Sequence, residues 1–234
     1  MISVFISKLA FEMLACVMIS EDLPVPTGGI IKKADDRDIL MKIKTLADYG
    51  YIAVDENDKI RLQEKTYSLM NPIVNAKFVA AIGFGYEESA YETVYYSDDA
   101  IYTVVQNSIN RPDMIKISGC DNGAFSDYID ELVNRLKPDI KNLETDESVH
   151  NLQWKIISEI NSNRTLLNAN VSYKDNYECV YKVLITETDK GLAIVKARTD
   201  GEITDIKPYS PENFVDFISM IAKADKNKIE FNMI

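Results

Sequence analysis

The chain has 234 residues, of which 46% are hydrophobic and 27% are charged, as in an ordinary soluble globular protein. This composition excludes disorder over most of the length, because disordered chains lack the apolar residues that build a core. The formal net charge of −11 excludes nucleic acid as a general partner and disfavours an anionic membrane surface, since both attract clustered lysine and arginine.

The first predicted element follows from the apolar stretch 1–18, which Lys8 and Glu12 interrupt. No small-residue cleavage site follows, so the pattern favours an amphipathic helix over a signal peptide. We therefore expect a cytoplasmic chain with no stable membrane insertion. The three cysteines are odd in number and widely spaced, which predicts reduced thiols rather than a disulfide framework: Cys16, Cys120 and Cys179.

A small helix-and-hairpin module is predicted next. A helix over 7–19 ends at a loop rich in proline and glycine over 22–29. A second helix begins at Asp35-Asp36 and ends at Tyr49-Gly50. The remaining predicted elements are a hairpin with strands 51–54 and 59–62, and a third helix from Gln63 to about Asn71 that ends before Pro72. A helix followed by a hairpin is the outline of a winged-helix module.

Two units of four strands and a helix then follow one another. The first has predicted strands at 78–84, 92–96, 101–105 and 114–118, and a helix over 124–136 that stops before Pro138. After an acidic linker, a long helix is predicted over 149–160. The second unit has predicted strands at 166–173, 178–186, 192–198 and 202–206, and a helix that begins at Ser210-Pro211.

An internal sequence repeat relates the two units. The stretch Tyr91-Glu92-Thr93-Val94-Tyr95 returns as Tyr177-Glu178-Cys179-Val180-Tyr181, an offset of 177 − 91 = 86 residues. In the two helices Phe125 matches Phe214, an offset of 214 − 125 = 89. Two copies are too few for a solenoid. The repeat therefore predicts a duplicated unit with quasi-two-fold symmetry.

These elements define an α+β fold. Strands joined by short turns pair antiparallel, so we expect an antiparallel sheet with helices on one face. Residues 1–75 form the N-terminal helices and hairpin, residues 76–144 the first sheet-helix repeat, and residues 145–234 the long helix and second repeat, all within one compact domain.

The sequence contains no recognisable catalytic, cofactor or metal motif. His150 is the only histidine, and Gly83-Phe84-Gly85 lacks both the third glycine and the following helix of a phosphate-binding turn. The cysteines lack the paired spacing of a zinc site. The acidic pairs Glu87-Glu88 and Asp98-Asp99 lack the alternation of a calcium loop, which favours solvated turns. We predict neither enzymatic activity nor a bound cofactor or metal.

Tyrosine is the one compositional excess, with 13 in the chain. Five of them crowd into the first repeat: Tyr86, Tyr91, Tyr95, Tyr96 and Tyr102. A tyrosine ring suits a protein interface, because it combines an apolar face with a hydrogen-bonding tip. It equally suits packing on a half-buried sheet, and both interpretations stay open.

The whole layout resembles the EspG and EsaE type chaperones of bacterial type VII (ESX/Ess) secretion. Three patches carry the resemblance, together with the duplicated sheet-helix unit: Glu21-Asp22-Leu23-Pro24-Val25-Pro26, the helix-hairpin 35–62, and Tyr67-Ser68-Leu69-Met70-Asn71-Pro72. It covers nearly the whole chain, whose composition is more similar to the Gram-positive branch than to the mycobacterial members.

The resemblance implies a cytosolic adaptor that binds a helical secreted client of the WXG, LXG or nuclease toxin type. The adaptor would keep this client soluble and help to deliver it to the secretion ATPase. By position, client contact falls on Tyr95, Tyr96, Asp98 and Asp99 of a hairpin turn, whose acidic tip could pair with basic client residues. A second candidate is the C-terminal helix with Phe214 and Phe217, although core packing is the stronger interpretation of these two residues.

Two other functions are open from the residues alone. One is a winged-helix transcriptional regulator with a duplicated ligand-binding domain. Its helix-hairpin region, residues 32–65, has eight basic and eight acidic residues, giving 8 − 8 = 0, and therefore lacks a basic stripe for DNA. The other is an enzyme whose site is assembled from scattered carboxylates and tyrosines.

Overall fold

The structure of the chain is a computed structural model. The structure describes residues 2–18, 23–25, 29–31, 35–54, 60–85, 91–97, 102–108, 111–119, 121–137, 165–173, 179–188 and 191–220. The predicted helix over 149–160 and His150 lie outside the described residues. Helices and antiparallel strands are both present, which confirms the α+β class.

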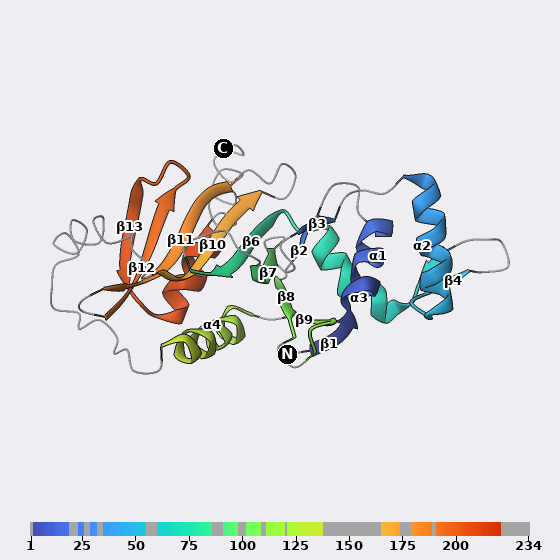
Figure 1. Cartoon of the computed structure of the whole chain (residues 1–234), viewed down its shortest axis with the longest axis horizontal. Helices are drawn as coiled ribbons and strands as arrows, with labels where there is room; N and C mark the ends of the chain where they lie inside the picture. Colours follow the sequence, from blue (N-terminus) through green and yellow to red (C-terminus); the bar gives the residue numbers. More distant parts are fainter. Residues whose placement is uncertain are drawn as a thin grey trace, which may run out of the picture.

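One nine-stranded sheet, in which every neighbouring pair is antiparallel, runs through the molecule (Figure 1). Its order is β1 (Ile2–Ser7), β9 (Met114–Gly119), β8 (Tyr102–Asn107), β7 (Tyr91–Ser97), β6 (Phe78–Phe84), β10 (Thr165–Tyr173), β11 (Cys179–Thr188), β12 (Gly191–Arg198) and β13 (Ile203–Pro208). The eight strands predicted for the two repeats are all present. Each repeat is a four-stranded meander, and the first strands of the two meanders lie side by side at the centre.

The register at the centre of the sheet is symmetric about the pair β6–β10. Ala80 pairs with Val171 across the two strands. On the outer sides, Ala80 pairs with Tyr95 of β7 and Val171 pairs with Tyr181 of β11. Tyr95 and Tyr181, the last tyrosines of the two motif copies, therefore pair with the two residues that face each other across β6 and β10. A two-fold arrangement requires this register, whereas common ancestry of the two halves stays a prediction.

The two faces of the sheet carry separate apolar cores. The first, here the meander core, packs α4 (Asn122–Leu136) and the C-terminal helical segment 211–220 on one face. Its buried members are Phe78, Ala80, Ile82, Phe125, Ile129, Leu132, Val133, Leu167, Ala169, Val171, Tyr181, Val183, Ile185, Leu192, Ile194, Tyr209, Phe214, Val215, Phe217 and Ile218. Alternate residues of one strand point to opposite faces, so Val79 of β6 faces the second core.

The second core, here the module core, joins the sheet to the N-terminal helices. These are α1 (Lys8–Met18), α2 (Asp36–Asp48) and α3 (Glu64–Val74), beside the short pairs β2 (Leu23–Val25) with β3 (Gly29–Ile31) and β4 (Ile52–Val54) with β5 (Ile60–Leu62). Its buried members are Ile6, Ala10, Phe11, Leu14, Ala15, Leu46, Ile52, Met70, Ile73, Ala76, Val79, Val94, Val105, Ile115 and Ile117. We call residues 8–74 the N-terminal module; Figure 1 places it at the opposite end of the molecule from β13.

The expectation of helices on one face only was wrong. Helices cover both faces, because β6 is buried from Phe78 to Gly83 and offers no polar side to water. A strand that is apolar throughout requires cover on both faces. The apolar sequence of β6 was the available signal.

The N-terminal region differs from prediction in three further places. Residues 2–7 form β1. Leu23–Val25, within the predicted loop, form β2, which pairs with β3 at the end of that loop. Helix α3 continues through Pro72 to Val74. Proline there removes one hydrogen bond in the last turn, while Ile73 beside it is fully buried in the module core. Burial of Ile73 offsets the lost bond.

Candidate binding site

The predicted hairpin residues Tyr95 and Tyr96 lie within strand β7 rather than in a turn. Tyr95 pairs with Ala80 on one side and Val104 on the other, and Tyr96 pairs with Val79 and Thr103. The strand runs on to Ser97 before the chain turns. Asp98 and Asp99 lie outside the described residues. Client contact at this hairpin therefore stays a prediction.

The second predicted pair belongs to the interior. Phe214 is 0% exposed and Phe217 is 1% exposed, and both pack in the meander core. The Tyr181 hydroxyl donates to the backbone oxygen of Phe217 over 2.7 Å, and the Lys207 amino group lies 4.7 Å from the centre of the Phe217 ring. These contacts match the core-packing alternative, and we remove both residues from the candidate surface.

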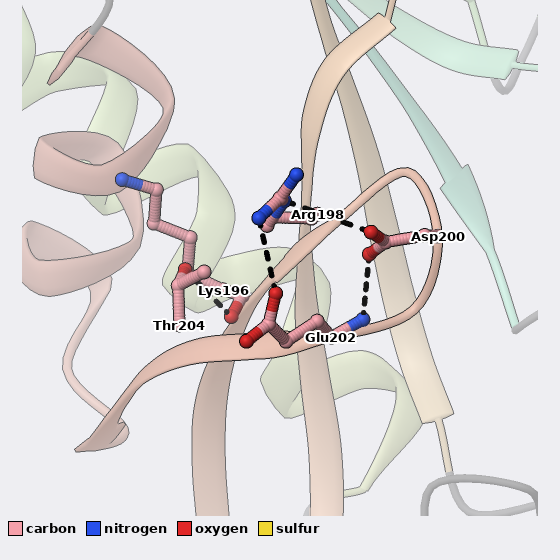
Figure 2. Close-up of polar contacts among 5 residues, drawn as sticks. All are labelled: Lys196, Arg198, Asp200, Glu202 and Thr204. Carbon is pink, nitrogen blue, oxygen red and sulfur yellow. Dashed lines mark hydrogen bonds and ion pairs between the residues drawn. The ribbon is translucent and has the colours of Figure 1, made fainter.

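The turn between β12 and β13 carries a cluster of charges that satisfy one another (Figure 2). Arg198 Nη1 lies 3.1 Å from Glu202 Oε2, and Arg198 Nε lies 3.7 Å from Asp200 Oδ2. Asp200 Oδ1 also accepts from the backbone N–H of Glu202 over 3.0 Å. Gly201 has φ of +89°, which only glycine adopts freely. These contacts close the turn, and they engage all three charged side chains with one another.

Exposed apolar side chains concentrate in a different part of the molecule. Among residues whose side chains the structure describes, nine large hydrophobic ones are exposed. Six lie in the first 67 residues, and three lie elsewhere: Phe5, Leu9, Leu40, Met41, Tyr49 and Tyr67 against Leu136, Val180 and Met220. Contiguous exposed apolar surface marks interaction sites. The N-terminal region is therefore the first place to look for one.

A groove of about 330 Å³ opens in this region, between the edge of the sheet and the N-terminal helices. Five parts of the chain line it: Val4, Phe5 and Ile6 of β1; Leu14 of α1; Tyr49, Gly50 and Tyr51 after α2; Gln63, Thr66, Leu69 and Met70 at α3; and Ile117 of β9. Leu14, Met70 and Ile117 are buried and form its floor, whereas Tyr49 at its mouth is 65% exposed. None of the lining residues is charged.

The turn after α2 places the tyrosines at the groove. Asp35 caps the start of the helix by accepting from the backbone N–H of Asp38 over 2.9 Å. At the other end Gly50 has φ of +74°, and the N–H of Tyr51 donates to the backbone oxygen of Leu46 over 2.9 Å. The backbone N–H of Gln63 then bonds to the oxygen of Tyr51 over 3.3 Å. This turn brings Tyr49, Tyr51 and Gln63 together.

The groove suits an uncharged apolar group, because a charge placed there would lose water without gaining a partner. Its volume lies at the small end of ligand pockets, which hold roughly 300–1,000 Å³. The sequence does not reveal the groove, because its lining comes from five separate segments and each segment resembles ordinary core. The Tyr49-Gly50-Tyr51 turn was the only local signal.

Other kinds of site find no support in the described part of the chain. There, no three His, Cys, Asp or Glu side chains gather closely enough to hold a metal ion.

Burial raises the pKa of the Cys16 thiol, an effect that nearby Lys42 partly opposes, so the thiol stays protonated at neutral pH. None of the described helices has the length and apolar character needed to cross a membrane.

Comparison with known proteins finds likeness in solved structures rather than in sequences. The sequence matches no protein-family model and no curated protein. In the search of solved structures, the fold matches the type VII secretion system chaperone EspG5 of Mycobacterium tuberculosis, solved in complex with a PE25-PPE41 dimer. The TM-score is 0.50 at 10% sequence identity, over 93% of this chain and 95% of that one. At this identity the match establishes an EspG-like fold and nothing finer.

Proposed function

We propose that this protein is a chaperone that binds a helical secretion client in the cytoplasm and is not an enzyme. The observation that carries the proposal is the match to EspG5 over nearly the full length of both chains. EspG5 was solved in complex with a PE25-PPE41 dimer, so a protein client is the corresponding expectation for this chain. By the resemblance described above, the clients would be LXG or nuclease toxin-like proteins, with the secretion ATPase as a further partner.

The groove supports client binding on physical grounds. A chaperone must shield apolar client residues that would otherwise cause aggregation, and an uncharged groove lined by the exposed Tyr49 suits that task. The predicted hairpin of Tyr95, Tyr96, Asp98 and Asp99 would supply a second contact, with its acidic tip facing basic client residues. Two contacts would together hold a longer client than either alone.

Co-expression tests the function itself. The chain would be produced with each small helical protein encoded beside it, and complexes would be detected by gel filtration. At least one pair should elute together with fixed stoichiometry and keep the client soluble. Failure with every neighbouring candidate would contradict the proposal.

Matched tyrosine variants test the groove. Tyr49→Glu places a charge at the mouth, so we expect client affinity to fall at least tenfold, or about 1.4 kcal/mol. Tyr67→Glu changes a similarly exposed tyrosine outside the groove lining and should bind normally. Isothermal titration with the purified client measures both. Equal losses in both variants would remove the groove from the binding surface.

The hairpin needs its own test. Exchanging both Asp98 and Asp99 for lysine reverses the charge of the predicted tip, which should slow client association and weaken its dependence on salt. Stopped-flow mixing at two ionic strengths measures the effect. Unchanged rates at both salt concentrations would exclude this loop.

A winged-helix regulator is the second candidate function, because the helix-hairpin order of α2, β4 and β5 is present. The charge balance of zero over residues 32–65 opposes it. A salt-sensitive mobility shift with DNA from the protein's own operon would support this candidate over the chaperone.

A further inference from the structure

The outer face of α2 has an unusual combination of side chains. Arg37, Leu40, Met41 and Lys44 follow the spacing i, i+3, i+4 and i+7, which places them on one side of the helix. All four are exposed; Leu40 reaches 66% and Met41 reaches 59%. In Figure 1, α2 lies at the end of the molecule farthest from β13. Below, this set of four residues is called the α2 face.

The stability of the fold does not account for the α2 face. The opposite side of the helix makes the packing contacts, with Leu46 buried in the module core and Ile43 against it. Arg37 sits in the first turn, where a cation opposes the helix dipole. Within the described part of the chain, neither Arg37 nor Lys44 forms an ion pair or side-chain hydrogen bond. Exposing two large apolar side chains also risks aggregation.

Charge decides what the α2 face can bind. The chain carries a net charge of −11, yet these four residues contribute two positive charges around an apolar pair. Asp48 lies one turn further along the same side and bounds the patch. A matching partner would present apolar side chains at the centre and carboxylates on both flanks. A helix is the simplest element with this pattern, because its side chains repeat at the same spacing.

We propose that the α2 face docks an acidic amphipathic helix of a partner protein. The surface is separate from the groove, since none of its four residues lines it. The inference therefore does not rest on the proposed function. A protein carrying a client in the groove would keep this face available for a second partner. Nucleic acid fits less well, because phosphates gain nothing from Leu40 and Met41 and the region from 32 to 65 is neutral overall.

A designed peptide tests the proposal directly. It would span about five helical turns, roughly 18 residues, with a leucine stripe flanked by glutamates and a fluorescent label. A second peptide would carry lysine in place of every glutamate. Fluorescence anisotropy should show binding of the glutamate peptide to the full-length protein, weakening as salt rises, and at least tenfold weaker binding of the lysine peptide.

Variants then locate the interaction. The double exchange Leu40→Ser with Met41→Ser should reduce affinity for the glutamate peptide at least tenfold. The double exchange Arg37→Glu with Lys44→Glu should also reduce affinity for the glutamate peptide at least tenfold. This variant should in addition bind the lysine peptide, whereas a misfolded variant would bind neither peptide. The matched control is Arg135→Glu with Leu136→Ser on α4, an exposed cation and leucine elsewhere. This control should bind like the unchanged protein.

Several results would overturn the proposal. Failure of the glutamate peptide to bind, or equal binding of it by all variants, would exclude the α2 face. Displacement of the peptide by a short DNA duplex would indicate a nucleic-acid site instead. Concentration-dependent self-association that the Leu40 and Met41 exchanges abolish would indicate that a second copy of the chain covers this face. Sedimentation velocity without peptide detects the last of these. Circular dichroism of each variant verifies that it is folded.

Discussion

The second meander and the N-terminal module bury their apolar side chains differently. In β12 the consecutive residues Leu192, Ala193, Ile194 and Val195 are all buried, with alternate members in the meander core and in a third cluster on the opposite face. Helix α2 instead buries one side and exposes Leu40 and Met41 on the other. The meander is therefore buried on both sides of its strands, whereas α2 leaves apolar side chains exposed, which is the surface that we propose for partner binding.

The largest effect should come from the meander core. Phe214→Ala removes a fully buried ring that packs between the C-terminal helix and the sheet, so we expect a loss of about 3–5 kcal/mol in the free energy of unfolding. Chemical denaturation followed by fluorescence measures it. A loss below about 1 kcal/mol would mean that the meander is not the main source of stability.

Two leucines on α2 test the contrast within one helix. Leu46→Ala empties a buried site of the module core and should cost about 2–5 kcal/mol. Leu40→Ala changes an exposed side chain and should stay within about 0.5 kcal/mol. Thermal unfolding of the two variants makes the comparison. Similar losses would show that the outer side of α2 is packed in solution.

A partly buried polar contact at the meander core should have a smaller, pH-dependent effect. The Tyr209 hydroxyl donates to Asp130 Oδ1 over 3.2 Å, and Tyr209→Phe should cost about 1 kcal/mol at neutral pH. Burial, with a further contribution from the Asp130 carboxylate, raises the pKa of Tyr209 well above its usual value near 10. Below pH 10, roughly, folded and unfolded chains both keep this proton. Above it only the unfolded chain loses the proton, so stability falls as pH rises.

The pH dependence can be measured by denaturant titrations between neutral and strongly alkaline pH. The unchanged protein should lose stability in the alkaline range, and the Tyr209→Phe variant should lose less over the same interval. Parallel curves for the two proteins would show that another group governs the alkaline loss.

The smallest effect should come from the exposed charges of the β12–β13 turn. Arg198→Ala removes its ion pairs with Asp200 and Glu202, but all three side chains are well exposed to water. We expect a loss below about 1 kcal/mol that disappears at high salt. Differential scanning calorimetry at two salt concentrations measures it. A larger, salt-independent loss would mean that this turn helps to organise the meander.

Sequence patterns predicted the elements well where the signal is local. The strands of both meanders follow from apolar runs separated by turns, and α2 follows from its acidic start and the glycine that ends it. For Phe214 and Phe217 the apolar helix stripe favoured core packing over a surface role, although such a stripe occurs in both. Burial settled that question.

Long-range pairing was beyond the reach of such patterns. Strand β1 pairs Val4 with Ile117, and nothing in Ile2–Ser7 identifies a partner so distant in sequence. The groove depends on the same pairing, since β1 forms one of its walls. The continuation of α3 through Pro72 likewise depends on tertiary burial, which outweighs the local preference of proline.

The position of β1 at the edge of the sheet has a consequence for synthesis on the ribosome. Its partner β9 emerges more than a hundred residues later, as the separation of Val4 from Ile117 shows (117 − 4 = 113). Contacts so far apart form late and slow the folding of the whole domain. Strand β1, and the groove wall it supplies, can therefore be completed only after the first meander exists. Pulse-labelled hydrogen exchange should show protection of β6 to β8 before β1.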